Sequence, residues 1–181
     1  MAAEHRRRHK THLDQHVKDV SGDYHYIGDW YVLSGGKRKL LPLQLWSLAM
    51  AACVIGAGCV RFAGMRNTWY VILPYLFSVG MLLGLALQLL RLRSGRLKTF
   101  DWERTCDKVA PFSGACGLFA LLAAVLGGVF LALHRDAGRV LDAIFFAALL
   151  LAAVCSRMAI SAYRSQEWKK QKEELRLKEN L

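Results

Sequence analysis

Four long apolar blocks alternate with polar segments along this 181-residue chain. The blocks cover about residues 41–62, 69–90, 110–133 and 140–163. At a rise of ~1.5 Å per helical residue, each block is long enough to cross the hydrocarbon core of a bilayer, which is roughly 30 Å thick. The pattern therefore predicts an all-α integral membrane protein with four transmembrane helices.

The polar segments divide the chain around these helices. Residues 1–40 form a polar, basic N-terminal segment, and residues 91–109 form a polar loop between the second and third blocks. The short connections within each half predict that the transmembrane domain, residues 41–163, folds as two helical hairpins joined by this loop. Residues 164–181 are rich in charge and are predicted to form a helix after the last block.

The distribution of lysine and arginine predicts the orientation. The N-terminal segment, the central loop and the residues from Arg157 onward carry 21 of the 25 basic residues, and the two short connections carry the other four. Basic residues concentrate on the cytoplasmic side of membrane proteins. We therefore expect a multi-pass protein of the cell membrane with both termini and the central loop in the cytoplasm.

The basic residues next to the apolar blocks are candidates for contact with lipid headgroups. They flank the first block and begin the central loop: Lys37, Arg38, Lys39, Arg91, Arg93, Arg96 and Lys98. Polybasic segments beside a membrane attract anionic lipids. The alternative is that these charges only set the orientation. Expected partners are the lipid bilayer, anionic lipids, a membrane or cytoplasmic protein and further copies of the chain.

Histidines in the N-terminal segment have helical spacing. His5, His9, His12 and His16 are separated by four, three and four residues, which would place their side chains on one face of a helix. Neutral imidazole is a common ligand of zinc, copper and nickel. The sequence offers these histidines as a candidate metal site, although the neighbouring arginines oppose cation binding and also fit a basic tail.

Glycines within the apolar blocks are candidates for close helix packing. Small residues let transmembrane helices approach one another, and Gly80 and Gly84 form one GxxxG pair. Further candidates lie in the first and third blocks: Gly56, Gly127 and Gly128. Packing of these glycines could occur within one chain or between copies.

No catalytic or nucleotide-binding motif is present in the sequence. It contains no HExxH motif and no Gly-rich phosphate loop, and the centres of the apolar blocks hold no ionisable group of the kind that ion-coupled transport uses. The basic residues match no nucleic-acid-binding motif. We expect no enzyme activity, no cofactor and no nucleic-acid partner.

Three functions remain open from the sequence. The first is a non-enzymatic scaffold or regulatory component that acts through its basic cytoplasmic segments. The second is a small transporter or channel subunit that oligomerises through its Gly-rich faces, and the third is a metal-responsive membrane protein that uses the histidine stripe.

Overall fold

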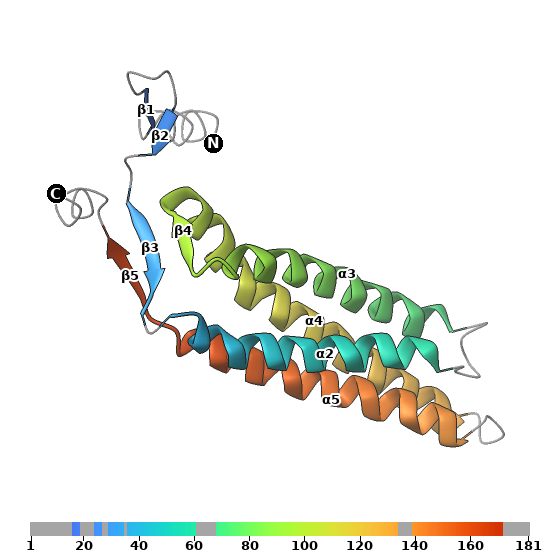
Figure 1. The fold of residues 1–181 in the computed structure, drawn as a ribbon. Helices are drawn as coiled ribbons and strands as arrows, with labels where there is room; N and C mark the ends of the chain where they lie inside the picture. Colours follow the sequence, from blue (N-terminus) through green and yellow to red (C-terminus); the bar gives the residue numbers. More distant parts are fainter. Residues whose placement is uncertain are drawn as a thin grey trace.

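A bundle of four long helices carries a small β-sheet at one end (Figure 1). The computed structural model describes residues 16–18, 24–26, 29–34, 36–60, 68–133 and 139–171. The helices are α2 (Leu41–Cys59), α3 (Trp69–Leu92), α4 (Thr99–Leu133) and α5 (Arg139–Arg164), and a 3-10 helix, η1 (Lys37–Leu40), leads into α2. All four long helices are apolar enough to span a membrane.

The helices pack in the order α2, α5, α4, α3. α5 lies against both α2 and α4, whereas α2 and α3 contact each other little. One α2–α3 contact is a hydrogen bond that Tyr75 Oη donates to the carbonyl of Val54 at 3.1 Å, far from the sheet. The first predicted hairpin is thus not a closely packed pair, because α5 occupies the position beside α2.

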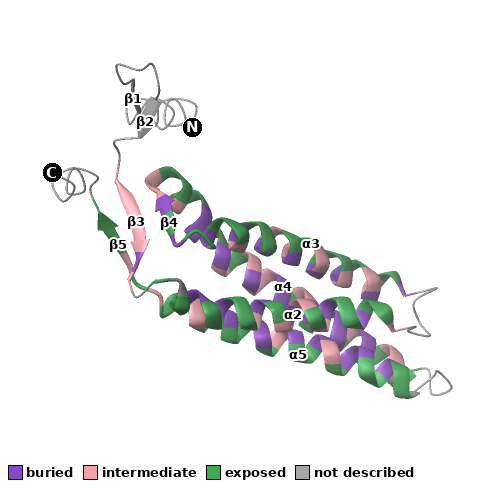
Figure 2. Cartoon of the chain, in the orientation of Figure 1, coloured by how far each residue is buried: buried purple, intermediate pink, exposed green. Residues whose placement is uncertain are grey.

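Apolar side chains cover the outside of the bundle, and small residues line its interior. Leu48, Trp69 and Val140 are 71–74% exposed, as expected for a surface that faces lipid. Cys116, Ala120 and many other small side chains are fully buried where helices meet. Figure 2 shows this alternation of exposed and buried positions along each helix.

The described residues also include five short strands. β1 (His16–Lys18) and β2 (Tyr24–Tyr26) form an antiparallel pair. β3 (Trp30–Leu33), β4 (Arg96–Lys98) and β5 (Trp168–Gln171) form a second sheet in the order β4-β3-β5. Both neighbours run antiparallel to β3.

The predicted loop 91–109 is largely helical. α3 continues to Leu92, β4 follows, and α4 begins at Thr99. The first turns of α4 are amphipathic, since Trp102, Cys106 and Val109 repeat at helical spacing and turn toward the bundle. Because α4 begins at Thr99 and not near residue 110, where the third apolar block begins, Pro111 lies well inside this helix.

The predicted helix over residues 164–181 is also wrong in its first part. α5 ends at Arg164, and residues 168–171 are strand β5. Residues 168–171 pair with β3 in place of forming a helix. The backbone hydrogen bonds between the two antiparallel strands outweigh the helix propensity of this charged stretch. Residues 172–181 lie outside the described residues.

Candidate functional site

Three segments that are far apart in the sequence meet in the second sheet. β3 precedes the first transmembrane helix, β4 lies between the second and third, and β5 follows the fourth. Tyr31 is aligned with Leu97 of β4 on one side and with Lys170 of β5 on the other. One strand from each of the three polar segments therefore lies in a single sheet at one end of the bundle (Figure 1).

Apolar contacts attach this sheet to the helix ends. Leu33 and Leu97 are 3% and 6% exposed and belong to the same core as the helices. The ring of Tyr31 stacks on Trp102 of α4 with centroids 4.1 Å apart. Since the backbone pairing sets Trp168 opposite Leu33, Trp168 shares this inner face and packs against the core.

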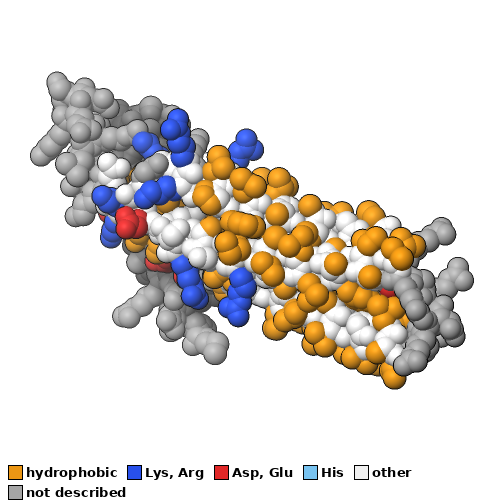
Figure 3. Space-filling view, turned by 90° about the horizontal axis from the view of Figure 1, so that it is seen from below, with side chains coloured by type: hydrophobic (Ala, Val, Ile, Leu, Met, Phe, Trp, Pro, Cys, Tyr) orange, Lys and Arg blue, Asp and Glu red, His pale blue; other side chains and the backbone are white. Residues whose placement is uncertain are grey.

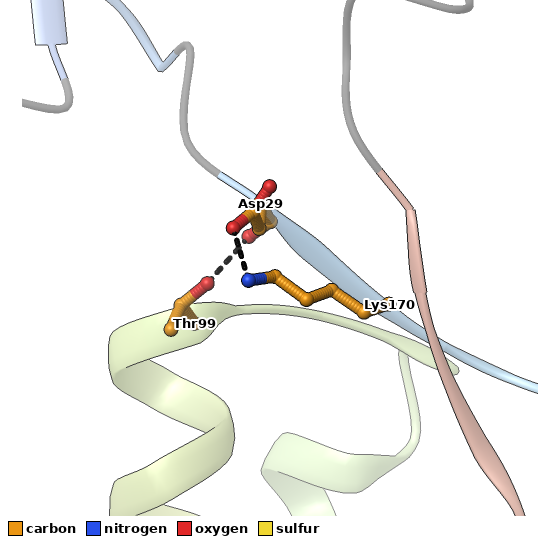
Figure 4. Close-up of polar contacts among 3 residues, drawn as sticks. All are labelled: Asp29, Thr99 and Lys170. Atoms are coloured by element: carbon orange, nitrogen blue, oxygen red, sulfur yellow. Dashed lines mark hydrogen bonds and ion pairs between the residues drawn. The ribbon is translucent and has the colours of Figure 1, made fainter.

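Asp29, just before β3, connects the sheet to both neighbouring segments (Figure 4). Its carboxylate pairs with Lys170 Nζ at 2.6 Å. Its backbone carbonyl accepts a hydrogen bond from Thr99 Oγ1 at 2.8 Å, at the start of α4. The hydrogen bond and charge of Asp29 raise the pKa of Lys170 above its usual value, so this lysine stays charged at neutral pH.

Basic side chains surround the sheet and the adjacent helix ends. We call this set the basic collar: Arg38, Lys39, Arg91, Arg93, Arg96, Lys98, Arg104, Lys108, Arg164, Lys169 and Lys170. All are exposed except Lys98, which is partly buried. Five described acidic residues lie at the same end: Asp29, Asp101, Glu103, Asp107 and Glu167. Figure 3 shows, on the face drawn, lysine and arginine at this end and hydrophobic side chains along the helices.

The collar contains six of the seven residues that the sequence offered for headgroup contact. Arg38 and Lys39 lie in η1, Arg91 lies in the last turn of α3, Arg93 follows that helix, and Arg96 begins β4. Lys98 lies 6.0 Å from the ring centroid of Trp30, within range of a cation–π contact. The backbone of Lys37 lies in η1, and its side chain is outside the described part of the structure.

Sequence reasoning missed the contribution of α4 and β5 to the collar. Arg104 and Lys108 are four residues apart on α4 and are both exposed. That spacing was visible in the sequence, but the segment was assigned to a loop. Lys169 and Lys170 join the collar only because β5 pairs with β3 across more than a hundred residues, and no local pattern encodes that pairing.

The candidate packing glycines fall into two groups. Gly84 lies against the ring of Phe112, and Gly127 lies against the ring of Phe146, so neither position has room for a larger side chain. Gly56, Gly80 and Gly128 are exposed and face open space. The GxxxG pair is thus split, because Gly84 turns toward α4 and Gly80 turns outward.

The histidine stripe falls mostly outside the described residues, which include only His16 among its four members. His16 begins strand β1, so the helical stripe does not extend to it. The pairing of His16–Lys18 with Tyr24–Tyr26 accounts for this difference, because tyrosine and valine favour strands. Among the described residues, no cluster of three or more potential metal ligands occurs.

Short polar contacts join the helices inside the bundle. Ser78 Oγ of α3 donates to the carbonyl of Cys116 at 3.3 Å. Ser156 Oγ of α5 donates to the carbonyl of Ser113 at 2.7 Å. Asp142 near the start of α5 is fully buried. The serine contacts fix the register of neighbouring helices and form no recognisable catalytic arrangement among the described residues.

Comparison with protein-family models, with curated proteins and with solved structures finds no match to this chain. The geometry of the sheet-bearing end therefore carries the functional argument.

Proposed function

We propose that this protein is a non-enzymatic membrane scaffold or regulatory component whose sheet-bearing end is a basic platform at the cytoplasmic membrane surface. The observation that carries the proposal is the joining of β3, β4 and β5 into one sheet bordered by the basic collar. Charges that served orientation alone could remain on separate loops. An ordered sheet instead holds them in a fixed arrangement that a partner can recognise.

The charge distribution supports a cytoplasmic location for this platform. The sheet-bearing end carries the eleven cations of the collar and five described acidic residues. The two connections at the other end of the bundle carry four basic residues in the sequence. This asymmetry has the direction of the positive-inside rule, so both flanking segments and the segment between α3 and α4 belong in the cytoplasm.

Anionic lipid is the first partner that the platform fits. The collar borders the apolar surface of the helices (Figure 3), and in a bilayer such a boundary would lie where headgroups meet hydrocarbon. Each lysine or arginine near an anionic membrane surface contributes about 1 kcal/mol of attraction. A protein partner with an acidic surface would be attracted to the same cations from the cytoplasmic side. Binding of such a partner is the proposed scaffold role.

Native mass spectrometry of the detergent-solubilised protein tests the lipid part. We expect the wild type to retain phosphatidylglycerol in preference to phosphatidylcholine. Replacing Arg38, Arg93, Arg96 and Lys169 with Gln should lower phosphatidylglycerol retention at least about tenfold, since several ~1 kcal/mol contributions are removed. The matched control replaces Arg61 and Arg66, which lie between α2 and α3, and should retain lipid as the wild type does.

Equal lipid retention by the collar variant and the wild type would contradict the lipid part of the proposal.

Affinity capture in mild detergent tests the scaffold part. A protein recovered with the wild type, and not with the collar variant, is expected. Recovery of this chain alone would count against it.

The outward-facing glycines favour a second candidate, an oligomeric transporter or channel subunit. A Cβ added at Gly56, Gly80 or Gly128 would meet no atom of another element within 4 Å, so another helix could approach the backbone closely at each. Light scattering of the detergent-solubilised protein tests this idea. An oligomer that Gly56→Leu and Gly80→Leu disrupt would support it, and a monomeric wild type that passes no solute in liposomes would reject it.

A further inference from the structure

Six buried side-chain polar atoms at the sheet-bearing end make no hydrogen bond within the described residues. They are Ser47 Oγ, Gln88 Oε1, Trp102 Nε1, Thr105 Oγ1, Gln166 Oε1 and Trp168 Nε1. Ser47, Gln88 and Thr105 are 5%, 8% and 0% exposed. Folded proteins pair nearly all such groups. Their concentration at one end therefore indicates a place where the protein meets a polar ligand.

Contacts between α3 and α4 show how deep in the bundle Gln88 lies, relative to α4. The two helices run antiparallel, with Ser78 against Cys116 and Gly84 against Phe112. Continuing this register by four residues brings Gln88 level with the turn of α4 that contains Thr105. The two side chains thus lie within about one helical turn, ~5 Å, of the same depth.

Contacts of α5 with α2 and with α4 show how deep in the bundle Ser47 of α2 lies. Cys53 of α2 lies beside Cys155 of α5, close enough for the two thiols to interact. On the other side of α5, Ser156 bonds to Ser113 of α4. Following these registers toward the sheet brings Ser47 level with the same turn of α4. Three helices therefore contribute buried polar side chains to one layer.

The sheet contributes the remaining polar atoms from above this layer. Trp168 lies on the inner face of the sheet, opposite Leu33. Trp102 lies one turn before Thr105 on α4 and is stacked under Tyr31. Gln166 leads into β5, and its Nε2 donates to the carbonyl of Lys39 while Oε1 stays unpaired within the described chain. Trp168 and Gln166 thus add polar atoms at the sheet, and Trp102 adds one at the start of α4, next to the layer that Ser47, Gln88 and Thr105 form inside the bundle.

Donors predominate among these atoms. The indole N–H groups of Trp102 and Trp168 can only donate, and the hydroxyls of Ser47 and Thr105 can donate. The exposed cations Arg91, Arg104 and Lys108 surround this end and favour an anion over a cation. Oxygen acceptors with negative charge, such as those of a phosphate group, fit this combination.

We propose that the space between the sheet and the helix ends is a phosphate-binding site, which opens when the sheet moves off the helices. The buried atoms are reached only through that movement, so binding and opening are coupled. The phosphate can belong to a lipid headgroup or to a soluble compound. This inference goes beyond the collar, because it concerns buried neutral donors, but it rests on the proposed basic platform for its preference for anions.

Tryptophan fluorescence tests the site in a variant that keeps only Trp102 and Trp168, with Trp30, Trp46 and Trp69 replaced by Phe. The protein in dodecyl maltoside micelles is titrated with inorganic phosphate in one arm and with dioctanoyl phosphatidic acid in the other. Dioctanoylglycerol serves as the lipid without phosphate. We expect a saturable change in emission with a phosphate probe and none with dioctanoylglycerol.

Thr105→Val decides whether the buried layer is responsible. The substitution keeps the shape and removes the hydroxyl, so it should weaken phosphate binding at least about tenfold. It should also raise the thermal midpoint without ligand, because it removes an unpaired buried polar group. Ser47→Ala provides a second variant with the same expectation. Ser94→Ala removes an exposed hydroxyl that bonds to the carbonyls of Arg91 and Arg96 in the turn after α3, so it should leave phosphate binding unchanged and should not raise the thermal midpoint.

The outcomes distinguish a lipid from a soluble source of the phosphate. They also distinguish the phosphate site from the basic platform. Tighter binding of phosphatidic acid identifies a lipid headgroup, and equal binding identifies a soluble phosphate compound; both support the site. No emission change with either probe, or unchanged binding by Thr105→Val and Ser47→Ala, overturns it. If the collar variant loses phosphatidylglycerol retention yet still binds the probe in the tryptophan assay, the two sites are distinct.

Discussion

The ring of Tyr31 stacks on the indole of Trp102 with the two planes 10° from parallel. Tyr31 lies in the first polar segment and Trp102 in the second, with two transmembrane helices between them in the sequence. This pair is a direct side-chain contact between the sheet and the bundle.

Removing the stack should loosen the sheet from the helices. Tyr31→Ala is expected to destabilise the protein by about 2–4 kcal/mol through lost aromatic burial and the lost ring pair. Tyr31→Phe keeps the ring and should stay close to the wild type. Unfolding in detergent micelles, followed by Trp102 emission in a single-tryptophan variant, measures both. Equal stability of Tyr31→Ala and Tyr31→Phe would show that the stack contributes nothing.

Two adjacent glycines on α4 should respond differently to the same substitution. Gly127→Ala places a methyl group against the ring of Phe146, which must move. We expect a loss of about 1–3 kcal/mol from overpacking. Gly128→Ala meets open space and should be neutral or slightly stabilising, since Ala favours helices over Gly. Thermal unfolding of the two variants in the same detergent makes the comparison, and a reversed order would contradict the packing of α4 on α5.

The two contacts of Asp29 should differ in strength. Thr99→Val removes the partly buried hydrogen bond to the Asp29 carbonyl and should cost about 1 kcal/mol. Lys170→Met removes an ion pair whose lysine side chain is 54% exposed, so we expect little change at neutral pH. Because Asp29 raises the pKa of Lys170, any stabilisation from the pair is present below pH 10.5 and is lost as the pH rises through the folded pKa. Urea titrations at pH 7 and pH 11 check both statements.

The transmembrane helices were readable from the sequence because each apolar block is long and uninterrupted. The structure has helices at all four, with α3 and α5 close to the predicted ends. The order of packing was not readable. The placement of α5 between α2 and α4 depends on matched small surfaces such as Gly117 against Ser156, which composition does not specify.

The platform was predicted only in part. The flanking cations, such as Arg38 and Arg93, lie at the helix ends next to the sheet, and their contact with lipid stays a prediction. The sheet was not predicted, since each strand has three or four residues and pairs with a partner far away in the sequence. The amphipathic start of α4 was visible as Trp102, Cys106 and Val109, but its charged outer face resembled a loop.

A single cytoplasmic platform requires β3, β4 and β5 to lie on one side of the membrane. Cysteine labelling tests this directly, in a variant without native cysteines that carries Arg38→Cys, Arg96→Cys or Lys169→Cys. A membrane-impermeant maleimide should label all three in inside-out vesicles and none in intact cells, whereas Trp69→Cys should show the opposite pattern. Labelling of any one of the three collar positions from the outside of intact cells would contradict a single cytoplasmic platform.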